Sequence, residues 1–363
     1  MTTKTSASQI GITLFLFQLG SAPLYLLGGT AKQDAWISII LAALAGFFLL
    51  LLHLQIFKMD EKQDLFDIYI SSFGKVIGGS IAFLYIGYFF YESIRVVRDL
   101  GEIVSVTLLN RTPISVVLLV TLTVIAFVAH YGPRVFFRFC GVFLYVILFA
   151  YFTVFTLICI SGLPQLSFML PVMENGFNPI LQTAFPDLLT FPFGQTILFL
   201  TLFKYATDQN KIKKTLLWSY TLVSILLLII NQVVLLVLGP QLATLATYPL
   251  YTVVQLIQVG HAVERSDVFF TLILFIGLFI KINLYYITIA IGLQRITKIK
   301  YKVWINVQIV PVFLISIIFP NYIDFMFGKH VTIITYIFLF FQIVFPVCLF
   351  AVMLVQKKRN SNY

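Results

Sequence analysis

The sequence predicts an all-α integral membrane protein in which ten transmembrane helices form two inverted halves. Of the 363 residues, 60% are hydrophobic and only 10% are charged, whereas soluble domains carry roughly 25% charged residues. Ten apolar runs have the length needed to span a bilayer, about 20 residues each. The first and the sixth of these runs are interrupted near their middles by glycine and proline. Residues 1–363 are therefore expected to form a single transmembrane domain.

The ten helices are placed by reading apolar runs between polar breaks. We expect them at Ile10–Leu27, Ala35–Phe57, Ser80–Leu109, Ile114–His130, Phe139–Gly162, Thr183–Tyr205, Thr215–Leu238, Asp267–Leu293, Val303–Phe319 and Val331–Val355. Five precede the connection between residues 162 and 183, and five follow it. An odd number of spans per half gives the halves opposite orientations, which is the geometry of an inverted repeat. The predicted repeats are residues 1–162 and 183–363.

Lysine and arginine are distributed unevenly among the connections. If the N-terminus lies in the cytoplasm, most basic loop residues lie there too, as in the loop from Lys58 to Lys75 and the tail from Lys357 to Arg359. Few basic residues, such as Lys32 and Arg111, would then lie outside. This bias follows the positive-inside rule and predicts that both termini are cytoplasmic. The alternating acids and bases between Lys58 and Lys75 are typical of a solvated surface.

The composition excludes several classes of function. The net charge of +10 is dispersed among the spans, whereas nucleic-acid binding needs a basic patch on one folded domain. The four histidines are scattered without metal-ligand spacing. The sequence contains no P-loop, dinucleotide fingerprint or nucleophile elbow. We therefore predict lipid contact but no enzyme activity, no cofactor, no metal and no nucleic-acid partner.

The two interrupted runs predict a ligand site. Unpaired peptide groups in lipid cost several kcal/mol each, so helices are broken there only where protein or a cavity satisfies the backbone. Two broken helices in matching positions are typical of a small-solute site near the membrane midplane. The alternative is a pair of proline kinks repaired by neighbouring helices. The candidate ligand-binding residues are Gly20, Ser21, Ala22 and Pro23 in the first run and Thr190, Phe191, Phe193, Gly194 and Gln195 in the second.

The third run carries an unusual number of polar side chains. Spacings of three and four residues place Glu92 beside Arg95, Arg95 beside Asp99, and Arg98 beside Glu102. Ionisable residues within spans are costly and normally face the bundle interior or water. The run can therefore be a polar wall or proton path, or a structural ladder of ion pairs. We interpret Tyr88 and Tyr91 as ligand-binding candidates, and Glu92, Arg95, Asp99 and Glu102 as coupling or gating candidates.

Lys281 is isolated in the eighth run, without an acid nearby in the sequence. A lone buried lysine must find a carboxylate, a cavity or a lowered pKa. We expect it to pair with Glu92, Asp99 or Glu102 as a structural group, or to act in gating or coupling, where its charge can replace a coupling cation.

These residues belong to a longer set of short motifs that resembles a known family. The chain resembles the B subunits of endospore nutrient-germinant receptors, the GerAB-type permeases of the amino acid–polyamine–organocation transporter superfamily. The motifs that carry the resemblance are Ile10-Gly11, Gly20-Ser21, Ala31–Trp36, Gly74–Gly78, Arg95–Glu102, Thr112-Pro113, Gly132-x-Arg134, Pro171–Gly176, Pro179–Leu181, Phe191–Gly194, Tyr248-Pro249 and Glu264-Arg265-x-Asp267. Each motif is weak alone, but in this order they are specific.

The resemblance implies a LeuT-like fold in the inner spore membrane. It also implies that the subunit binds a nutrient germinant, an amino acid or a sugar, and works beside an A-type subunit and a C-type lipoprotein subunit. The family usually has Glu after Pro-Phe-Gly, where this chain has Gln195. The neutral amide removes a charge that could hold an ammonium group or relay protons, which makes neutral germinants more plausible.

Three functions are compatible with these features. The first is a receptor subunit that binds germinant between the first and sixth helices and signals through its partners. The second is a proton-coupled transporter of amino acids or other small solutes, which uses Lys281 or a carboxylate of the third run. The third is an ion or water conduit opened by partner subunits.

Overall fold

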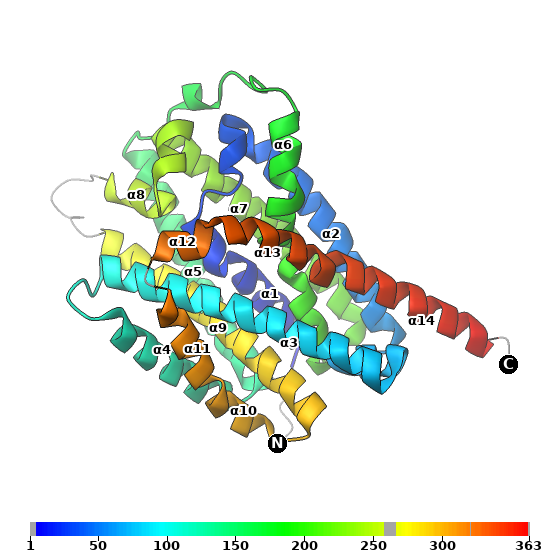
Figure 1. The fold of residues 1–363 in the computed structure, drawn as a ribbon. Helices are drawn as coiled ribbons and strands as arrows, with labels where there is room; N and C mark the ends of the chain where they lie inside the picture. The colour runs from blue at the N-terminus through cyan, green and yellow to red at the C-terminus, as the bar shows by residue number, and fades with distance from the viewer. Residues whose placement is uncertain (1–4, 258–265, 320, 362–363) are drawn as a thin grey trace.

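The computed structural model describes residues 5–257, 266–319 and 321–361. All regular elements in these three ranges are helices, and the extended pairing there is an isolated bridge between Thr5 and Ala206. The helices form one bundle, from which the end of α14 (Phe345–Ser361) projects (Figure 1). The all-α class predicted from the sequence is confirmed. Glu264 and Arg265, which are part of the family resemblance, lie outside the described residues.

The α-helices extend over the following residues. They are α1 (Ala7–Ser21), α2 (Ala35–Met59), α3 (Leu65–Thr107), α4 (Ile114–Ala129), α5 (Pro133–Ile160), α6 (Asn178–Gln182), α7 (Gln209–Leu245), α8 (Pro249–Gln255), α9 (Ser266–Thr297), α10 (Tyr301–Val307), α11 (Ile309–Ile318), α12 (Tyr322–Phe327), α13 (Lys329–Leu339) and α14 (Phe345–Ser361). Short 3₁₀ or π segments join several of them, including η5 (Phe193–Thr201), η6 (Phe203–Tyr205) and η8 (Phe340–Val344).

Eight helical segments in the described part are long and apolar enough to cross a membrane. A ninth predicted span, α4, is a shorter apolar helix. The remaining predicted span, Thr183–Tyr205, is a series of π and 3₁₀ turns rather than one α-helix. The count of ten spans and the division into two inverted repeats therefore stay predictions.

Some helix boundaries differ from the predicted ones. Helix α3 begins at Leu65 rather than at Ser80, because its first turns are amphipathic and join the rest through a kink at Gly74, where φ is 81°. Helix α7 continues past the predicted end at Leu238 through a second kink, at Gly239, where φ is 72°. In both places glycine supplies the left-handed backbone that other residues rarely adopt.

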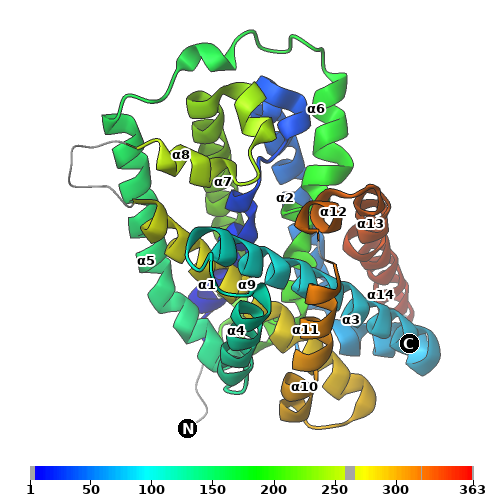
Figure 2. The same cartoon turned by 60° about the vertical axis from the view of Figure 1, so that its left-hand side comes forward.

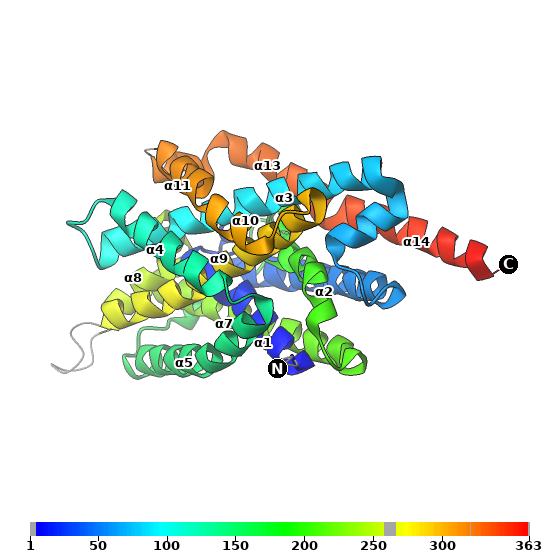
Figure 3. The ribbon, with the colours of Figure 1, turned by 90° about the horizontal axis from the view of Figure 1, so that it is seen from below.

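Helices α1 and α9 form the interior of the bundle. They lie between α3 on one side and α5 and α7 on the other (Figure 3). In the most apolar 18-residue window of each helix, 83% of α1 and 72% of α9 are buried. This is expected for helices that are apolar all round. The outer helices expose large side chains such as Phe48, Phe127 and Phe149, as suits a surface in contact with lipid.

The first predicted helix break is present in the structure. Helix α1 stops at Ser21, a single 3₁₀ turn with Pro23 follows, and Tyr25 is extended with φ −114° and ψ 156°. Proline lacks the backbone N–H that the next helical hydrogen bond requires. The break lies where α1 meets α9, because a Cβ on Gly20 would be only 2.7 Å from the carbonyl oxygen of Gly277.

The second predicted break is also present. Phe185 leaves helical geometry with φ −135° and ψ 114°. The chain then turns at Phe191 and Pro192 and continues as the 3₁₀ segment η5. Every residue of η5 is buried, so its weakly bonded backbone is enclosed by protein rather than by lipid, as the cost of unpaired peptide groups demands.

A partly buried ionic cluster lies near the end of the bundle where α1 begins. Asp64, the N-cap residue of α3, forms ion pairs with Lys204 of η6 and with Arg295 of α9, whose Nε is 3.0 Å from Asp64 Oδ2. The same two cations contact Asp67 at 3.8 and 3.2 Å. Burial raises the pKa of Asp64, but Lys204 and Arg295 outweigh it and hold the pKa below its usual value.

This cluster corrects the interpretation of the Lys58–Lys75 loop as a solvated surface. The side chain of Asp64 is 0% exposed. Beside the cluster, the backbone N–H of Thr207 donates to the carbonyl of Thr5 at 2.9 Å. The carboxylate of Asp64 therefore ties the start of α3 to the ends of η6 and α9, which are distant in sequence.

Replacing Asp64 by Asn is expected to destabilise the protein by about 3 kcal/mol, because the largely buried Lys204 and the partly exposed Arg295 then lose the charge of their shared buried partner. The contribution of Asp64 is present above the carboxyl's unfolded pKa of about 3.9 and is lost as the pH falls through its lower folded pKa. Thermal unfolding of purified wild type and Asp64→Asn between pH 3 and pH 8 measures both effects. Asp208→Asn, which breaks an exposed pair with Lys211, is the control and should leave the melting temperature unchanged. Equal melting temperatures for both variants would contradict the role of the cluster.

Candidate functional site

The amino group of Lys281 lies between the two helix breaks. Its Nζ donates to Ser21 Oγ at 2.9 Å and to Gln195 Oε1 at 2.7 Å. The ring centroids of Phe17 and Phe191 lie 5.0 and 4.9 Å from the same nitrogen, within the range of favourable cation–π contacts. Lys281 is completely buried. This one side chain therefore connects α9 to both interrupted segments.

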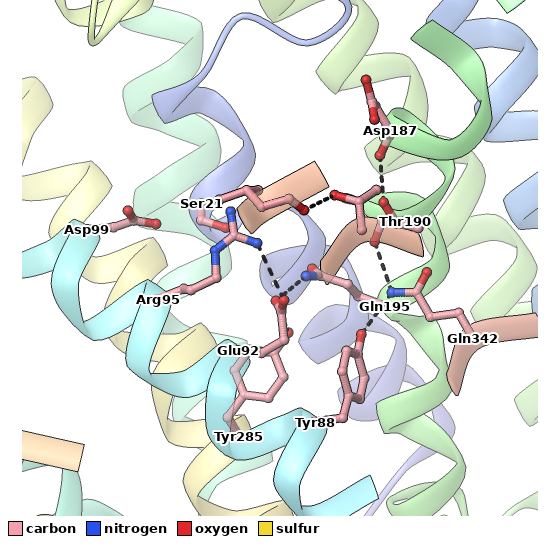
Figure 4. A network of polar contacts seen from close by, with 12 residues as sticks. Ser21, Tyr88, Glu92, Arg95, Asp99, Asp187, Thr190, Gln195, Tyr285 and Gln342 are labelled. Carbon is pink, nitrogen blue, oxygen red and sulfur yellow. Dashed lines mark hydrogen bonds and ion pairs between the residues drawn. The ribbon is translucent and has the colours of Figure 1, made fainter. Parts of the chain in front are cut away.

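Glu92 of α3 lies on the other side of Gln195 (Figure 4). Gln195 Nε2 donates to Glu92 Oε2 at 2.6 Å, and the hydroxyl of Tyr285 donates to the same oxygen at 3.2 Å. Arg95 Nη1 is 3.7 Å from Glu92 Oε1, which confirms the predicted neighbours on α3. Because the Gln195 amide separates Lys281 from Glu92, the expected direct pairing of the lysine with this carboxylate is not formed.

The remaining charges of α3 form two groups. Asp99 Oδ1 accepts hydrogen bonds from the hydroxyls of Tyr25 at 2.6 Å and Tyr322 at 3.0 Å. Arg98 Nη2 is 3.5 Å from Glu102 Oε2, as the four-residue spacing predicts. The predicted contact of Asp99 with the arginine four residues earlier is not among the described ion pairs. Instead, two tyrosines from distant segments hold the Asp99 carboxylate.

The backbone freed at the second break is satisfied by a side chain of η8. Gln342 Nε2 donates to the carbonyl oxygen of Thr190 at 3.0 Å and to the hydroxyl of Tyr88 at 2.8 Å. The hydroxyl of Thr190 in turn donates to the carbonyl of Asp187 at 2.9 Å. Gln342 lies in a π segment, a geometry frequently found at functional sites. The Gln342 amide and the Thr190 hydroxyl thus satisfy two backbone carbonyl oxygens at the second break.

Gln342, Tyr285 and Tyr322 belong to the site but were not predicted from the sequence. Gln342 could have been found, because an amide inside the apolar run Val331–Val355 needs a buried partner. The two tyrosines could not, because this chain contains 18 tyrosines and their positions follow no pattern that separates site from lipid contact.

A cavity of about 880 Å³ lies at the end of the bundle away from the Asp64 cluster. Its floor and walls include Tyr25, Arg95, Asp187, Thr190, Phe191 and Phe338. Residues 26–30 and 32, which follow the first break, and residues 243–247, at the end of α7 and just beyond it, supply much of the rest. The connection between α5 and α6 arches over this end (Figure 2). Cavities of 300–1,000 Å³ are the usual size for small-molecule sites.

The structure places the predicted site residues in two layers. Thr190, Phe191 and Arg95 line the cavity. The other predicted ligand-binding residues are not among its lining residues: Gly20, Ser21, Ala22, Pro23, Tyr88, Tyr91, Phe193, Gly194 and Gln195. Gly194 is closed off by protein, since a Cβ there would lie 2.1 Å from Gln342 Oε1 and 2.7 Å from the carbonyl of Leu189.

The predicted coupling residues are likewise divided. Glu92 and Lys281 lie below the cavity in one network with Gln195. Glu102 lines a second cavity of about 580 Å³ together with Tyr248 and Tyr322. Tyr91 packs against Phe338, with ring centroids 5.8 Å apart. Among the described residues, no group of three or more metal-ligating side chains lies close enough to hold an ion.

These features define a helical protein with membrane-spanning segments and an open cavity next to a buried polar network at two interrupted segments. Residues 4–326 match the model of the family described as spore germination protein, and the chain belongs to this family.

Curated relatives carry the same description. Spore germination protein KB of Bacillus subtilis is 29% identical over 99% of this chain and 97% of its own length. Spore germination protein A2 of the same organism is 25% identical over 78% of this chain and 77% of its own length. The family resemblance inferred from the short motifs is therefore confirmed.

Solved structures include a more distant likeness. A mutant of the manganese transporter of Eremococcus coleocola is 12% identical, with a TM-score of 0.48 over 96% of this chain and 74% of the transporter. This likeness is too low to transfer an ion or a substrate to the present chain.

Proposed function

We propose that this chain is the B-type membrane subunit of a spore germinant receptor. In this proposal, a small nutrient germinant binds in the 880 Å³ cavity, and the subunit signals through an A-type subunit and a C-type lipoprotein subunit. The protein lies in the inner spore membrane with both termini on the core side. The family membership supports the biological setting, and the cavity at the two breaks is the observation that carries the binding role.

The connected side chains suggest how binding could be communicated. Phe191 lines the cavity and also contacts Lys281. From Lys281 the contacts continue through Gln195 to Glu92, so α1, α3, η5 and α9 are all joined below the ligand. A ligand shifts a conformational equilibrium only through a difference in affinity for the two states. In this proposal the germinant contacts Phe191 differently in the two states, and that contact supplies the difference in affinity.

Proton-coupled transport is the second candidate function. It is supported by the position of the cavity, which lies at the end of the bundle away from the Asp64 cluster, since alternating access requires a state that is open on one side. Uptake of a labelled nutrient into proteoliposomes that saturates and follows a pH gradient would establish it. A conduit for ions or water remains the third candidate, and it predicts flux without saturation by the nutrient.

Spores that carry this subunit in their sole germinant receptor test the proposed function. Phe191→Ala is expected to raise the half-maximal germinant concentration about tenfold, equivalent to about 1.4 kcal/mol, because it removes a cavity wall and the contact to Lys281. The measurement is the loss of optical density during germination with single nutrients. Phe149→Ala, the same truncation at an exposed position, is the control. An unchanged response in Phe191→Ala would contradict binding in this cavity.

A further inference from the structure

Two neighbouring polar side chains just before α2 are buried. Gln33 and Asp34 end the 3₁₀ segment η2 (Gly29–Asp34), which follows the first break, and they are only 5% and 2% exposed. Asp34 occupies the N-cap position of α2, where an aspartate normally accepts a backbone N–H of its own helix. Here its side chain makes no capping hydrogen bond. The carboxylate therefore serves contacts outside α2.

Both side chains bind the connection between α5 and α6, which arches over the cavity (Figure 2). Asp34 Oδ1 and Oδ2 accept the backbone N–H of Met173 at 2.9 and 3.0 Å. Gln33 Nε2 donates to the carbonyl oxygen of Pro171 at 3.1 Å and to Glu174 Oε2 at 3.0 Å. The bound stretch of the connection is exposed, so hydrogen bonds rather than burial hold it in place. We call this arrangement the clasp, and it consists of Gln33, Asp34 and residues 171–174.

The clasp continues directly into the wall of the cavity. Lys32, which precedes the clasp in the chain, lines the cavity, and so do Thr30 and Thr183; we call these three residues the rim. The hydroxyl oxygens of Thr30 and Thr183 are 2.5 Å apart, which joins η2 to the start of the second interrupted segment. Close by in the chain, Ser38 Oγ of α2 donates to the carbonyl oxygen of Ile180 at 3.0 Å. The outer parts of both interrupted segments are thus tied to each other at the cavity.

The backbone on both sides of the clasp has a conformation that side-chain-bearing residues rarely adopt. Lys32 has φ 52° and ψ −123°, and Met173 has φ 59°. Such residues persist where surrounding contacts hold them. The hydrogen bonds of Gln33 and Asp34 are contacts of this kind, since they begin directly after Lys32 and end on Met173. Loss of these bonds therefore lets the backbone relax, and the rim changes shape with it.

We propose that Gln33 and Asp34 are positioning residues that hold the rim of the cavity, through the clasp, in the shape that binds the germinant. The inference rests on the proposed function, since it concerns how the same cavity is kept ready for its ligand. A site that is already ordered costs less free energy to bind than one that the ligand must order. The clasp stays closed when the germinant binds. Breaking the clasp therefore weakens binding, whereas locking it covalently leaves the response intact.

The first experiment tests the clasp itself on the purified full-length protein. Endoproteinase Glu-C cleaves after glutamate, and Glu174 is the glutamate of the clasp. Asp34→Ala should increase the rate of cleavage after Glu174 at least about tenfold, because cleavage follows local opening, and mass spectrometry identifies the site. Asp208→Ala is the matched control, since Asp208 is also an N-cap residue without a capping hydrogen bond, and it should cleave like wild type. Equal cleavage rates in Asp34→Ala and wild type overturn the clasp.

The second experiment uses spores whose sole germinant receptor contains this subunit, and it offers the standard amino acids, D-glucose and inosine singly. Asp34→Ala should raise the half-maximal concentration of the active nutrient about tenfold. The maximal germination rate and the amount of subunit should stay at wild-type values, whereas a general folding defect lowers both. Asp34→Asn keeps one oxygen for the N–H of Met173 and should raise the half-maximal concentration only about threefold. Asp208→Ala should respond like wild type.

A covalent lock decides whether the clasp holds or has to open. The exposed thiols Cys159 and Cys348 are first replaced by serine. In the Asp34→Ala background, Gln33→Cys and Glu174→Cys are then joined by a short, reducible bis-thiosulfonate reagent in decoated spores. The link should return the half-maximal concentration to within about twofold of wild type, and reduction should cancel this gain. Chains with only one of the two cysteine substitutions are the controls and should not be rescued.

Three results overturn the positioning role and leave the receptor function intact. They are a lock that abolishes the response until it is reduced, a lock that gives no rescue, and an unchanged half-maximal concentration in Asp34→Ala. Wild-type spores that respond to none of the nutrients count against the receptor function and against the positioning role together. The cleavage experiment does not depend on germination, so it separates failure of the clasp from failure of the proposed function.

Discussion

Lys281→Met is expected to abolish the germination response while the protein still accumulates in the membrane. Methionine has a similar length, but it leaves Ser21 Oγ and Gln195 Oε1 without their donor. A hydrogen bond to a charged group contributes about 1.5–3 kcal/mol, so the loss of two corresponds to a weakening of at least about 100-fold. Germination of spores with a sole receptor measures the response, and immunoblotting of spore membranes measures the amount of subunit.

Ser21→Ala is the graded control for this experiment. It removes one of the two acceptors of Lys281 and leaves the contact with Gln195 in place. Its response should lie between wild type and Lys281→Met. Normal germination of Lys281→Met would exclude both a structural and a signalling role for the lysine, and with them the proposed route from the cavity to α3.

Gly20→Val is expected to have the second-largest effect, because the first break has no room for a side chain. A Cβ at this position would lie 2.7 Å from the carbonyl oxygen of Gly277 and 3.0 Å from Cβ of Lys281. Since one of these atoms is backbone, α1 and α9 must separate, and Lys281 moves with them. We expect loss of response with normal membrane insertion, measured in the same spores.

Gly87→Val provides the matched control, because a Cβ on this glycine of α3 would meet nothing within 4 Å. It should germinate like wild type. Gly20→Ala tests the contact of the Cβ alone, without the two methyl groups of valine. Because this single carbon already makes the close contact, the variant should show a partial defect. Equal responses of Gly20→Val and Gly87→Val would show that the close approach at the break does not matter for signalling.

The sequence contained local information about this site but little about its long-range contacts. The two breaks followed from glycine and proline within apolar runs, and the pairs Glu92–Arg95 and Arg98–Glu102 followed from helical spacing. The partner of Lys281 did not, because it depends on how α9 packs against η5 rather than on any spacing. The same holds for Asp99, whose partners Tyr25 and Tyr322 are 74 and 223 residues away.

For Asp64 the sequence predicted an exposed position, whereas the structure buries its side chain. The segment between Lys58 and Lys75, which contains Asp64, alternates acids and bases in the sequence, which is also the pattern of an ordinary exposed loop. Only the packing of η6 and α9 against the start of α3 buries the Asp64 carboxylate between Lys204 and Arg295. The charge pattern identifies such residues, but it cannot distinguish a solvated loop from a segment that forms ion pairs with other helices.

The amide of Gln195 has a consequence for proton movement. It donates through nitrogen to Glu92 and accepts through oxygen from Lys281, so its orientation is fixed by its two charged neighbours. A carboxylic acid in this position could take up a proton on one oxygen and release it from the other. An amide can do so only through its unstable imidic acid tautomer. Lys281, Gln195 and Glu92 therefore link α9, η5 and α3 by hydrogen bonds, but a proton cannot pass from Lys281 to Glu92 by Grotthuss hopping through this amide.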